Sequence, residues 1–287
     1  MLYGIITHGG AGSPEEWRDG CIRAAREGFR ILAEGGSALR AVIEAVRLLE
    51  DDGRFNAGTG SILRIDGKTI EMDASLMDST GSLAMVMAVR DVKNPVLLAE
   101  ALLKTPHLAI AGEGATGFAK RLGLEPHPGP SEKALRDYEN LKKQIAQGKI
   151  KEINPLWKGY ERFLADTVGA VAMDKQGVFA VASSTGGASP MLIGRVGDTP
   201  IPGCGFFAGP SGAIAMTGTG EEIIRRFAAR TIYELIEKGM AAQEALQRII
   251  NSFPEDIPAG AIAITGDGLA QYSNRAMAWA SMVEKGS

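Results

Sequence analysis

The order of the apolar segments is the feature of this 287-residue chain that most restricts its fold. Segments with helical spacing and segments with strand spacing occur in both halves of the chain. They do not follow the regular strand, helix, strand alternation that a doubly wound parallel sheet requires. We therefore predict a layered α+β fold, in which helices cover sheets. The length allows a substantial core to be buried.

The expected elements can be placed from turn residues and caps. A short strand over 2–7 runs into His8-Gly9-Gly10-Ala11-Gly12, and Pro14 precedes a long helical stretch. Ser37 is the expected cap of a second helix over 38–49. Further on we predict strands at 61–65, 69–77, 82–89, 178–183, 212–216, 260–265, 268–272 and 277–282, another starting at 167, and helices at 95–103, 114–122, 221–238 and 241–253.

A stretch of different composition separates the two halves. Residues 126–165 are rich in Lys, Glu, Pro and Gly, with one charged helix-like run at 132–147. Such a composition buries little apolar surface. We predict a mobile surface connector with weak ties to the core.

Bulk composition excludes several classes of protein. Apolar residues make up 45% and charged residues 23% of the chain, as in globular proteins. The net charge of −3 gives no electrostatic reason to expect nucleic acid or an anionic membrane as a partner. We find no apolar run long enough for a membrane span and no signal-type leader, and we expect a cytoplasmic protein with Cys21 and Cys204 reduced.

Two motifs resemble catalytic or cofactor sites but have simpler explanations. Gly112-Glu-Gly-Ala-Thr-Gly117 matches the dinucleotide fingerprint, yet no second parallel strand with a ribose-binding acid follows it. We expect an ordinary helix start there. His8-Gly9-Gly10 is similar to an oxyanion tripeptide of serine hydrolases, but no serine lies in a G-x-S-x-G elbow. Its glycines are expected to let the backbone turn close to another segment.

The second half repeatedly places threonine beside glycine at the ends of expected strands. Each case alone has an ordinary explanation, because Thr favours strands and Gly favours turns. An Arg three residues before an Asp is often a surface ion pair. Together they form an ordered series: Asp166-Thr167-Val-Gly, Ser184-Thr185-Gly-Gly, Gly194-Arg195-Val-Gly-Asp198 and Thr217-Gly-Thr-Gly-Glu221.

With these segments, the chain resembles the plant-type L-asparaginases and isoaspartyl aminopeptidases, which are N-terminal-nucleophile hydrolases. The resemblance covers nearly the whole chain, because His8-Gly-Gly-Ala-Gly12, Phe55-Asn-Ala-Gly-Thr-Gly-Ser61 and Met72-Asp-Ala-Ser75 precede the threonine segments in the family's order. It implies a four-layer αββα sandwich, formed by residues 1–287 as a single domain. It also implies a precursor that cleaves itself between Asp166 and Thr167 into an α subunit, 1–166, and a β subunit, 167–287.

The chemistry of a threonine nucleophile explains why such a cut is useful. A threonine hydroxyl is a weak nucleophile at neutral pH and needs an adjacent base. Cleavage before Thr167 would free an α-amino group with a reference pKa near ~7.7–8.0, which can accept the hydroxyl proton. A histidine is then not needed as the base, which fits a chain with only three histidines.

The resemblance also assigns roles to other residues. Thr185 would orient the Thr167 hydroxyl, and Thr217 with the Gly218 N–H would form the oxyanion hole. Arg195 would bind the α-carboxylate of the substrate, Asp198 its α-ammonium group, and Gly220 would add a backbone contact. The carboxylate of Asp166 would assist self-cleavage.

The activity implied is hydrolysis of L-asparagine to L-aspartate and ammonia, and removal of N-terminal isoaspartyl residues from dipeptides, through a β-aspartyl ester of Thr167. Aspartate before the nucleophile is usual in glycosylasparaginases, so a glycosylasparaginase-like β-aspartyl amidase is an alternative. A non-cleaving aspartate-binding relative is a second alternative, from a different functional class.

The resemblance implies no cofactor for catalysis, but it does imply a structural sodium ion beside the active site. It also implies a homodimer of αβ units. The ligands of the ion would be main-chain carbonyl groups, which here belong to Leu49, Glu50, Asp52, Phe55, Ala57 and Thr59.

Overall fold

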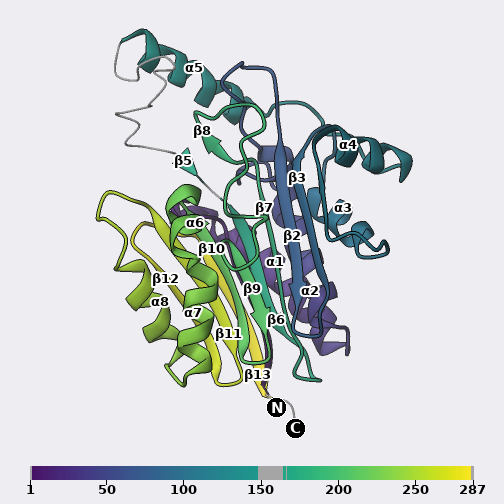
Figure 1. The fold of residues 1–287 in the computed structure, drawn as a ribbon, viewed down its shortest axis with the longest axis vertical. Helices are drawn as coiled ribbons and strands as arrows, with labels where there is room; N and C mark the ends of the chain where they lie inside the picture. The colour runs from purple at the N-terminus through teal and green to yellow at the C-terminus, as the bar shows by residue number, and fades with distance from the viewer. Residues whose placement is uncertain (1, 148–163, 166, 286–287) are drawn as a thin grey trace.

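The computed structural model describes residues 2–147, 164–165 and 167–285, and it contains both helices and strands in each half of the chain (Figure 1). This confirms the α+β class predicted from the sequence. The residue before the expected nucleophile, Asp166, lies outside the described residues, as does 148–163 of the connector.

The first strands of the second half of the chain lie near the centre of the larger sheet. Among the described residues it has seven strands in the order β13-β1-β6-β7-β2-β3-β4, and all neighbours are antiparallel except the parallel pair β3–β4. In that order the strands are Trp279–Lys285, Leu2–His8, Val168–Met173, Phe179–Thr185, Met72–Asp78, Leu83–Val89 and Ala109–Ala111.

A smaller antiparallel sheet faces the large one. In the described part of the chain it has four strands in the order β12-β11-β10-β9, which are Gly268–Ser273, Ala259–Thr265, Gly212–Gly218 and Phe206–Gly209. Every residue of β6, β7, β10 and β11 is buried. Strands buried on both faces need cover from both sides, and here one side is the facing sheet.

Helices cover the outer faces of the two sheets (Figure 1). On the large sheet, α2 contacts β6 and β7, α1 contacts β1 and β13, and α3 contacts β2 and β3. On the small sheet, α7 contacts β9 and β10 while α8 contacts β11 and β12. The helices are α1 Arg18–Ala33, α2 Ala38–Asp51, α3 Pro95–Leu102, α4 Gly112–Arg121, α5 Glu132–Ala146, α6 Gly220–Arg226, α7 Ala228–Glu237 and α8 Ala242–Ile250, with short 3₁₀ turns at Glu15–Trp17 and Gly58–Gly60.

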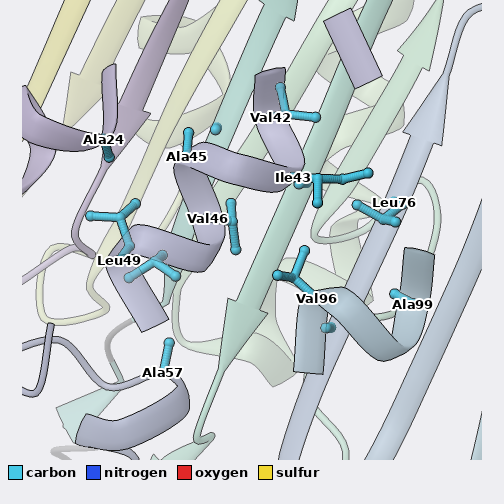
Figure 2. Packing of buried hydrophobic residues seen from close by; sticks show 14 of the residues in the cluster. Ala24, Val42, Ile43, Ala45, Val46, Leu49, Ala57, Leu76, Val96 and Ala99 are labelled. Carbon is cyan, nitrogen blue, oxygen red and sulfur yellow. The ribbon is translucent and has the colours of Figure 1, made fainter. Parts of the chain in front are cut away.

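Apolar side chains fill the spaces between these elements in three clusters. One lies between α1–α3 and the large sheet, and Figure 2 shows Val42, Ile43 and Val46 of α2 packed in it with Leu76 of β2. A second joins α7 and α8 to the small sheet. The third lies between the sheets and includes Val171 and Ile262. Ser37 begins α2 as expected, because its hydroxyl accepts a hydrogen bond from the Arg40 N–H at 3.2 Å.

Several boundaries differ from the prediction. The helix expected over 221–238 is two helices, because Phe227 adopts a left-handed conformation (φ 47°) between α6 and α7. The expected strand at 61–65 is absent, since these residues form irregular structure fixed by Arg64. Strands β4 and β9 were not predicted, nor was the two-stranded pair of β5 (Leu164–Ala165) and β8 (Ala188–Ser189). Gly112 starts α4, so the expected helix start is confirmed.

The first part of the connector, 126–147, is tied to the first half more firmly than predicted. The His127 ring lies with Nε2 2.9 Å from the Gly58 carbonyl oxygen, and the Tyr138 hydroxyl donates to the Ile65 carbonyl at 3.2 Å. Ala134 and Leu141 of α5 are buried. The charged composition concealed these contacts, because they come from His127 and from a few side chains of the polar helix α5.

None of the helices in the described ranges is long and apolar enough to cross a membrane.

Glycines in two helices offer a test of this packing. A Cβ atom on Gly28 of α1 would lie 2.4 Å from Ile5 Cδ1 and 3.0 Å from the Ala41 carbonyl oxygen. A Cβ on Gly117 of α4 would meet nothing within 4 Å. We expect Gly28→Ala to lower the free energy of unfolding by about 1–2 kcal/mol through overpacking. Gly117→Ala should raise it by roughly 0.5–1 kcal/mol, because alanine favours helix.

Urea denaturation of the two variants and the parent would measure both effects. The two substitutions are chemically identical, so helix propensity acts equally on them. Equal gains in stability would contradict the close contact of α1 with β1 and α2.

Candidate active site

The site begins where two neighbouring strands of the large sheet end. Val168 of β6 pairs with Ser184 of β7. Continuing this antiparallel register by one residue places Thr167 opposite Thr185. Both threonines are buried, Thr167 just before β6 and Thr185 as the last residue of β7. The two threonine segments therefore lie side by side at one end of the large sheet.

The Thr167 hydroxyl also lies near a residue that was not predicted to belong to the site. Its Oγ1 is 3.5 Å from Thr199 Oγ1. Thr199 is fixed in turn, because its carbonyl oxygen accepts a hydrogen bond from the Ser75 hydroxyl at 2.7 Å. Ser75 ends the quoted motif Met72-Asp-Ala-Ser75, and Thr199 directly follows Asp198, the last residue of another. The signal for Thr199 in the sequence was therefore a hydroxyl residue directly after the Arg-x-x-Asp motif.

The end of β10 is joined to the first glycine-rich segment. The Thr217 hydroxyl accepts a hydrogen bond from the Ala11 N–H at 3.0 Å. A Cβ atom on Gly9 would lie 2.3 Å from Cε1 of the Phe55 ring, so a side chain cannot be accommodated there. The close approach expected for the glycines of this segment is confirmed.

Arg195 and Asp198 lie on the loop after β8, and they meet the start of α6. A Cβ atom on Gly220 would be 2.8 Å from Asp198 Oδ1 and 2.9 Å from Arg195 Nη2. The two charged groups therefore lie within 3 Å of one point, over a residue that must be glycine. The structure thus brings Arg195, Asp198 and Gly220 together, and Asp198 lies next in sequence to Thr199 beside the nucleophile.

Arg195 is not a surface ion-pair residue, because its side chain is only 18% exposed. Its Nε and Nη2 atoms donate to Glu221 Oε1 and Oε2 at 2.8 and 2.7 Å. Burial alone would lower the pKa of Arg195, but the hydrogen bonds to Glu221 outweigh it and raise the pKa. Glu221 is the last residue of the fourth threonine segment, and no role was predicted for it.

Asp198 is held without a compensating hydrogen bond on one oxygen. Among the described residues, Asp198 Oδ2 has no hydrogen-bond partner, although the side chain is buried. Burial raises the pKa of Asp198 to about 7, against the opposing charge of Arg195. A buried carboxyl with a free oxygen is suited to receive a cationic ligand group.

A buried ion-pair network lies under this loop and was not predicted. Arg64 is fully buried, and its Nε donates to Glu71 Oε2 at 3.1 Å while Nη1 donates to the Gly186 carbonyl at 2.8 Å. Glu71 also accepts from the Gly194 N–H at 2.6 Å. The network therefore links the residue after Thr185 to the residue before Arg195. One arginine within the apolar run Ile62-Leu63-Arg64-Ile65 was its signal in the sequence.

The loop expected to hold a cation is hydrogen-bonded to the segment that follows Thr185. Asn56 accepts from the Ile62 N–H at 3.2 Å and donates to the Gly187 carbonyl at 2.6 Å. Main-chain carbonyls crowd the glycines of this loop: a Cβ on Gly58 would be 2.6 Å from the Glu50 oxygen, and one on Gly60 would be 2.0 Å from the Phe55 oxygen.

These carbonyl oxygens approach the two glycines so closely that neither position can carry a side chain. In the described ranges, no group of three or more His, Cys, Asp or Glu residues converges as metal ligands would.

The buried network predicts different effects for its two arginines. Glu71 is paired with Arg64, which is fully buried, and with Arg90, which is half-exposed. Arg64→Met should lower the free energy of unfolding by about 3–5 kcal/mol, because it leaves a buried carboxylate without its buried partner. Arg90→Met should cost less than about 1 kcal/mol, because solvent screens the exposed pair. Urea denaturation would compare them, and equal losses would contradict the assignment of Arg64 as the central cation.

Known proteins resemble this chain over most of its length. A family model described as asparaginase matches residues 1–287. The isoaspartyl peptidase/L-asparaginase of Macaca fascicularis is 39% identical over 290 residues, which cover 96% of this chain and 92% of that protein. The one from Mus musculus is 40% identical, covering 97% and 87% of the two chains. The plant-type L-asparaginase of Thermococcus kodakarensis is 43% identical, covering 87% and 85%. The chain therefore belongs to the asparaginase family.

Proposed function

We propose that this protein is a self-cleaving amidohydrolase that converts L-asparagine to L-aspartate and ammonia, and that removes N-terminal isoaspartyl residues from dipeptides. The observation that carries the proposal is the grouping of Thr167, Thr199, Asp198, Arg195 and Gly220 in one site. The names of the related isoaspartyl peptidases and L-asparaginases support it.

The proposed nucleophile is Thr167, freed by cleavage of the bond after Asp166. The new α-amino group accepts the hydroxyl proton as Oγ1 attacks the side-chain amide carbonyl of the substrate. The tetrahedral intermediate collapses to a β-aspartyl ester of Thr167, and the proton passes to the departing ammonia or amine. Water then hydrolyses the ester and releases L-aspartate. The buried position of Thr167 supports this role, since burial limits competing reactions with solvent.

Hydroxyl and backbone donors would stabilise the developing charges. We assign Thr185 to orienting the Thr167 hydroxyl, as their places at adjacent strand ends allow. Thr217 and the Gly218 N–H would form the oxyanion hole, in which loss of one donor typically costs ~3 kcal/mol of transition-state stabilisation. The Ala11 N–H fixes the Thr217 hydroxyl by donating to its oxygen, so the hydroxyl hydrogen is free to point elsewhere.

Substrate recognition would depend on the two charged groups attached to the α-carbon of the substrate. Arg195 binds the α-carboxylate and Asp198 accepts from the α-ammonium group, with Gly220 between them. These two groups of an amino acid are attached to one carbon atom, so their partners must lie close together. The positions of Arg195 Nη2 and Asp198 Oδ1 around Gly220 support this assignment.

The wider architecture enters the proposal through the same family. We infer a four-layer αββα sandwich of the N-terminal-nucleophile hydrolase type for the single domain 1–287, and the helix and sheet contacts support it. Cleavage would give an α subunit, 1–166, with the connector 126–165 near its end, and a β subunit, 167–287. A homodimer of αβ units follows from family resemblance alone. Two free, buried cysteines support a cytoplasmic location.

A structural sodium ion is also part of the proposal. It rests on the family resemblance, and the main-chain oxygens of Glu50 and Phe55 would be two of its ligands. The remaining ligands would be the carbonyls of Leu49, Asp52, Ala57 and Thr59. Such an ion would fix the loop behind Thr185 and take no part in bond breaking.

Intact mass spectrometry tests the nucleophile directly. We expect the parent, incubated at raised temperature, to convert from one chain of 30.3 kDa into two chains that end at 166 and begin at 167. Thr167→Ala should stay intact and release no ammonia from L-asparagine, because it lacks the attacking hydroxyl. A parent that never splits yet binds L-aspartate would overturn the proposal in favour of a non-cleaving binding protein. Dominant turnover of glycosylated asparagine would favour the glycosylasparaginase alternative.

The pKa of Asp198 predicts how KM depends on pH. Its pKa is raised to about 7, so the carboxyl is increasingly protonated below pH 7 and loses its attraction for an ammonium group. We expect KM for L-asparagine to rise as the pH falls from 8 to 5.5, approaching roughly tenfold per pH unit below 7. Steady-state kinetics across this range measures it. A flat KM would show that Asp198 does not hold the substrate ammonium group.

A further inference from the structure

The guanidinium of Arg195 offers two different edges to carboxylates. It has five N–H donors, and an acidic group can bind either along Nε and Nη2 or along the two Nη atoms. Glu221 occupies the first edge, with hydrogen bonds of 2.8 Å at Nε and 2.7 Å at Nη2. On the second edge, Nη1 has only a weak contact of 3.5 Å with the sulfur of Met191. Two good donors are thus left for a ligand.

The unoccupied edge borders the groups that would hold an amino acid. A Cβ atom on Gly197 would lie 2.7 Å from Arg195 Nη1, and one on Gly220 would lie 2.9 Å from Nη2. Asp198 Oδ1 borders the same point over Gly220, at 2.8 Å. The two-Nη edge therefore borders the partner of the ammonium group, and two glycines leave it free of side chains.

Glu221 is well placed to hold the guanidinium in this orientation. It is the second residue of α6, directly after Gly220, so its backbone is fixed by the same turn that borders the site. Its carboxylate is partly exposed, at 42%, while the arginine is largely buried. Burial alone would raise the pKa of Glu221, but its hydrogen bonds to Arg195 lower it, so the carboxylate stays ionised at neutral pH.

We propose that Glu221 is a positioning residue for substrate recognition: it holds the Nε and Nη2 edge of Arg195, so that the two-Nη edge faces the α-carboxylate of the substrate. The inference rests on the proposed function, because it takes Arg195 as the group that binds this carboxylate. Without Glu221, the guanidinium would rotate among several orientations, and binding would lose the energy needed to fix one.

The experiment compares Glu221→Ala and Glu221→Gln with the parent and with Glu222→Ala. Glu222 is the matched control, since it is the next residue on α6 and pairs with Arg226 instead of Arg195. Intact mass is measured first for each protein, followed by KM and kcat for L-asparagine. We expect Glu221→Ala to raise KM about tenfold or more, with kcat changed less than about threefold. Glu221→Gln keeps one acceptor and should give a smaller rise, and Glu222→Ala should match the parent.

Two inhibitors separate positioning of Arg195 from a general change in the fold. L-Aspartate carries the α-carboxylate, and β-alanine is the same molecule without it. Glu221→Ala should raise the inhibition constant of L-aspartate in parallel with KM and leave that of β-alanine unchanged. Glu221→Gln provides the same comparison if the alanine variant fails to fold.

The other outcomes are informative in different ways. A lower KM in Glu221→Ala would mean that Glu221 competes with substrate for Arg195, and an unchanged KM would mean that Arg195 needs no help; either overturns the positioning role. Equal weakening of both inhibitors would also overturn it. A parent that neither splits nor hydrolyses L-asparagine would instead defeat the proposed function itself, and this inference with it.

Discussion

The antiparallel pairing of β6 with β7 is the constraint on which the site depends. Both strands are buried at every residue, between helices on one side and the smaller sheet on the other. A shift of their register by one residue would turn every side chain to the opposite face, so the apolar core itself fixes the pairing of Val168 with Ser184. The relative position of Thr167 and Thr185 is thus set by hydrophobic packing some distance from the polar site.

A buried ion pair carries that order outwards to the loop that bears the charged groups. Arg64 bonds to Gly186, directly after Thr185, and Glu71 accepts from Gly194, directly before Arg195. Because neither partner can reach solvent, leaving one unpaired is costly, and the two segments are held together. The loop of Arg195 has little secondary structure of its own. The Arg64–Glu71 ion pair therefore holds this loop in place, as strand pairing holds Thr167 and Thr185.

The sequence predicted those parts of the fold and site that follow local rules. Helical periodicity and the Ser37 cap located α2, and Thr–Gly pairs marked the ends of β7 and β10. The break at Phe227 was missed because its left-handed backbone is uncommon for a bulky residue and has no glycine to signal it. Thr199 directly follows a quoted motif and Glu221 ends another, but their partners are 32 and 26 residues away in sequence. Only the folded chain shows which residues such long-range contacts join.

The described part of the connector is also hydrogen-bonded to the loop that supports Thr185. The Gly129 N–H donates to Nδ1 of His127 at 3.0 Å, which leaves the ring hydrogen on Nε2 to be donated to the Gly58 carbonyl. Burial lowers the pKa of His127, and this favours the neutral ring that such a pattern requires. Gly58 lies two residues after Asn56, whose side chain binds Gly187. The segment that precedes the proposed cleavage point is therefore anchored, at its start, to the loop that supports Thr185, so cleavage before Thr167 need not loosen that loop.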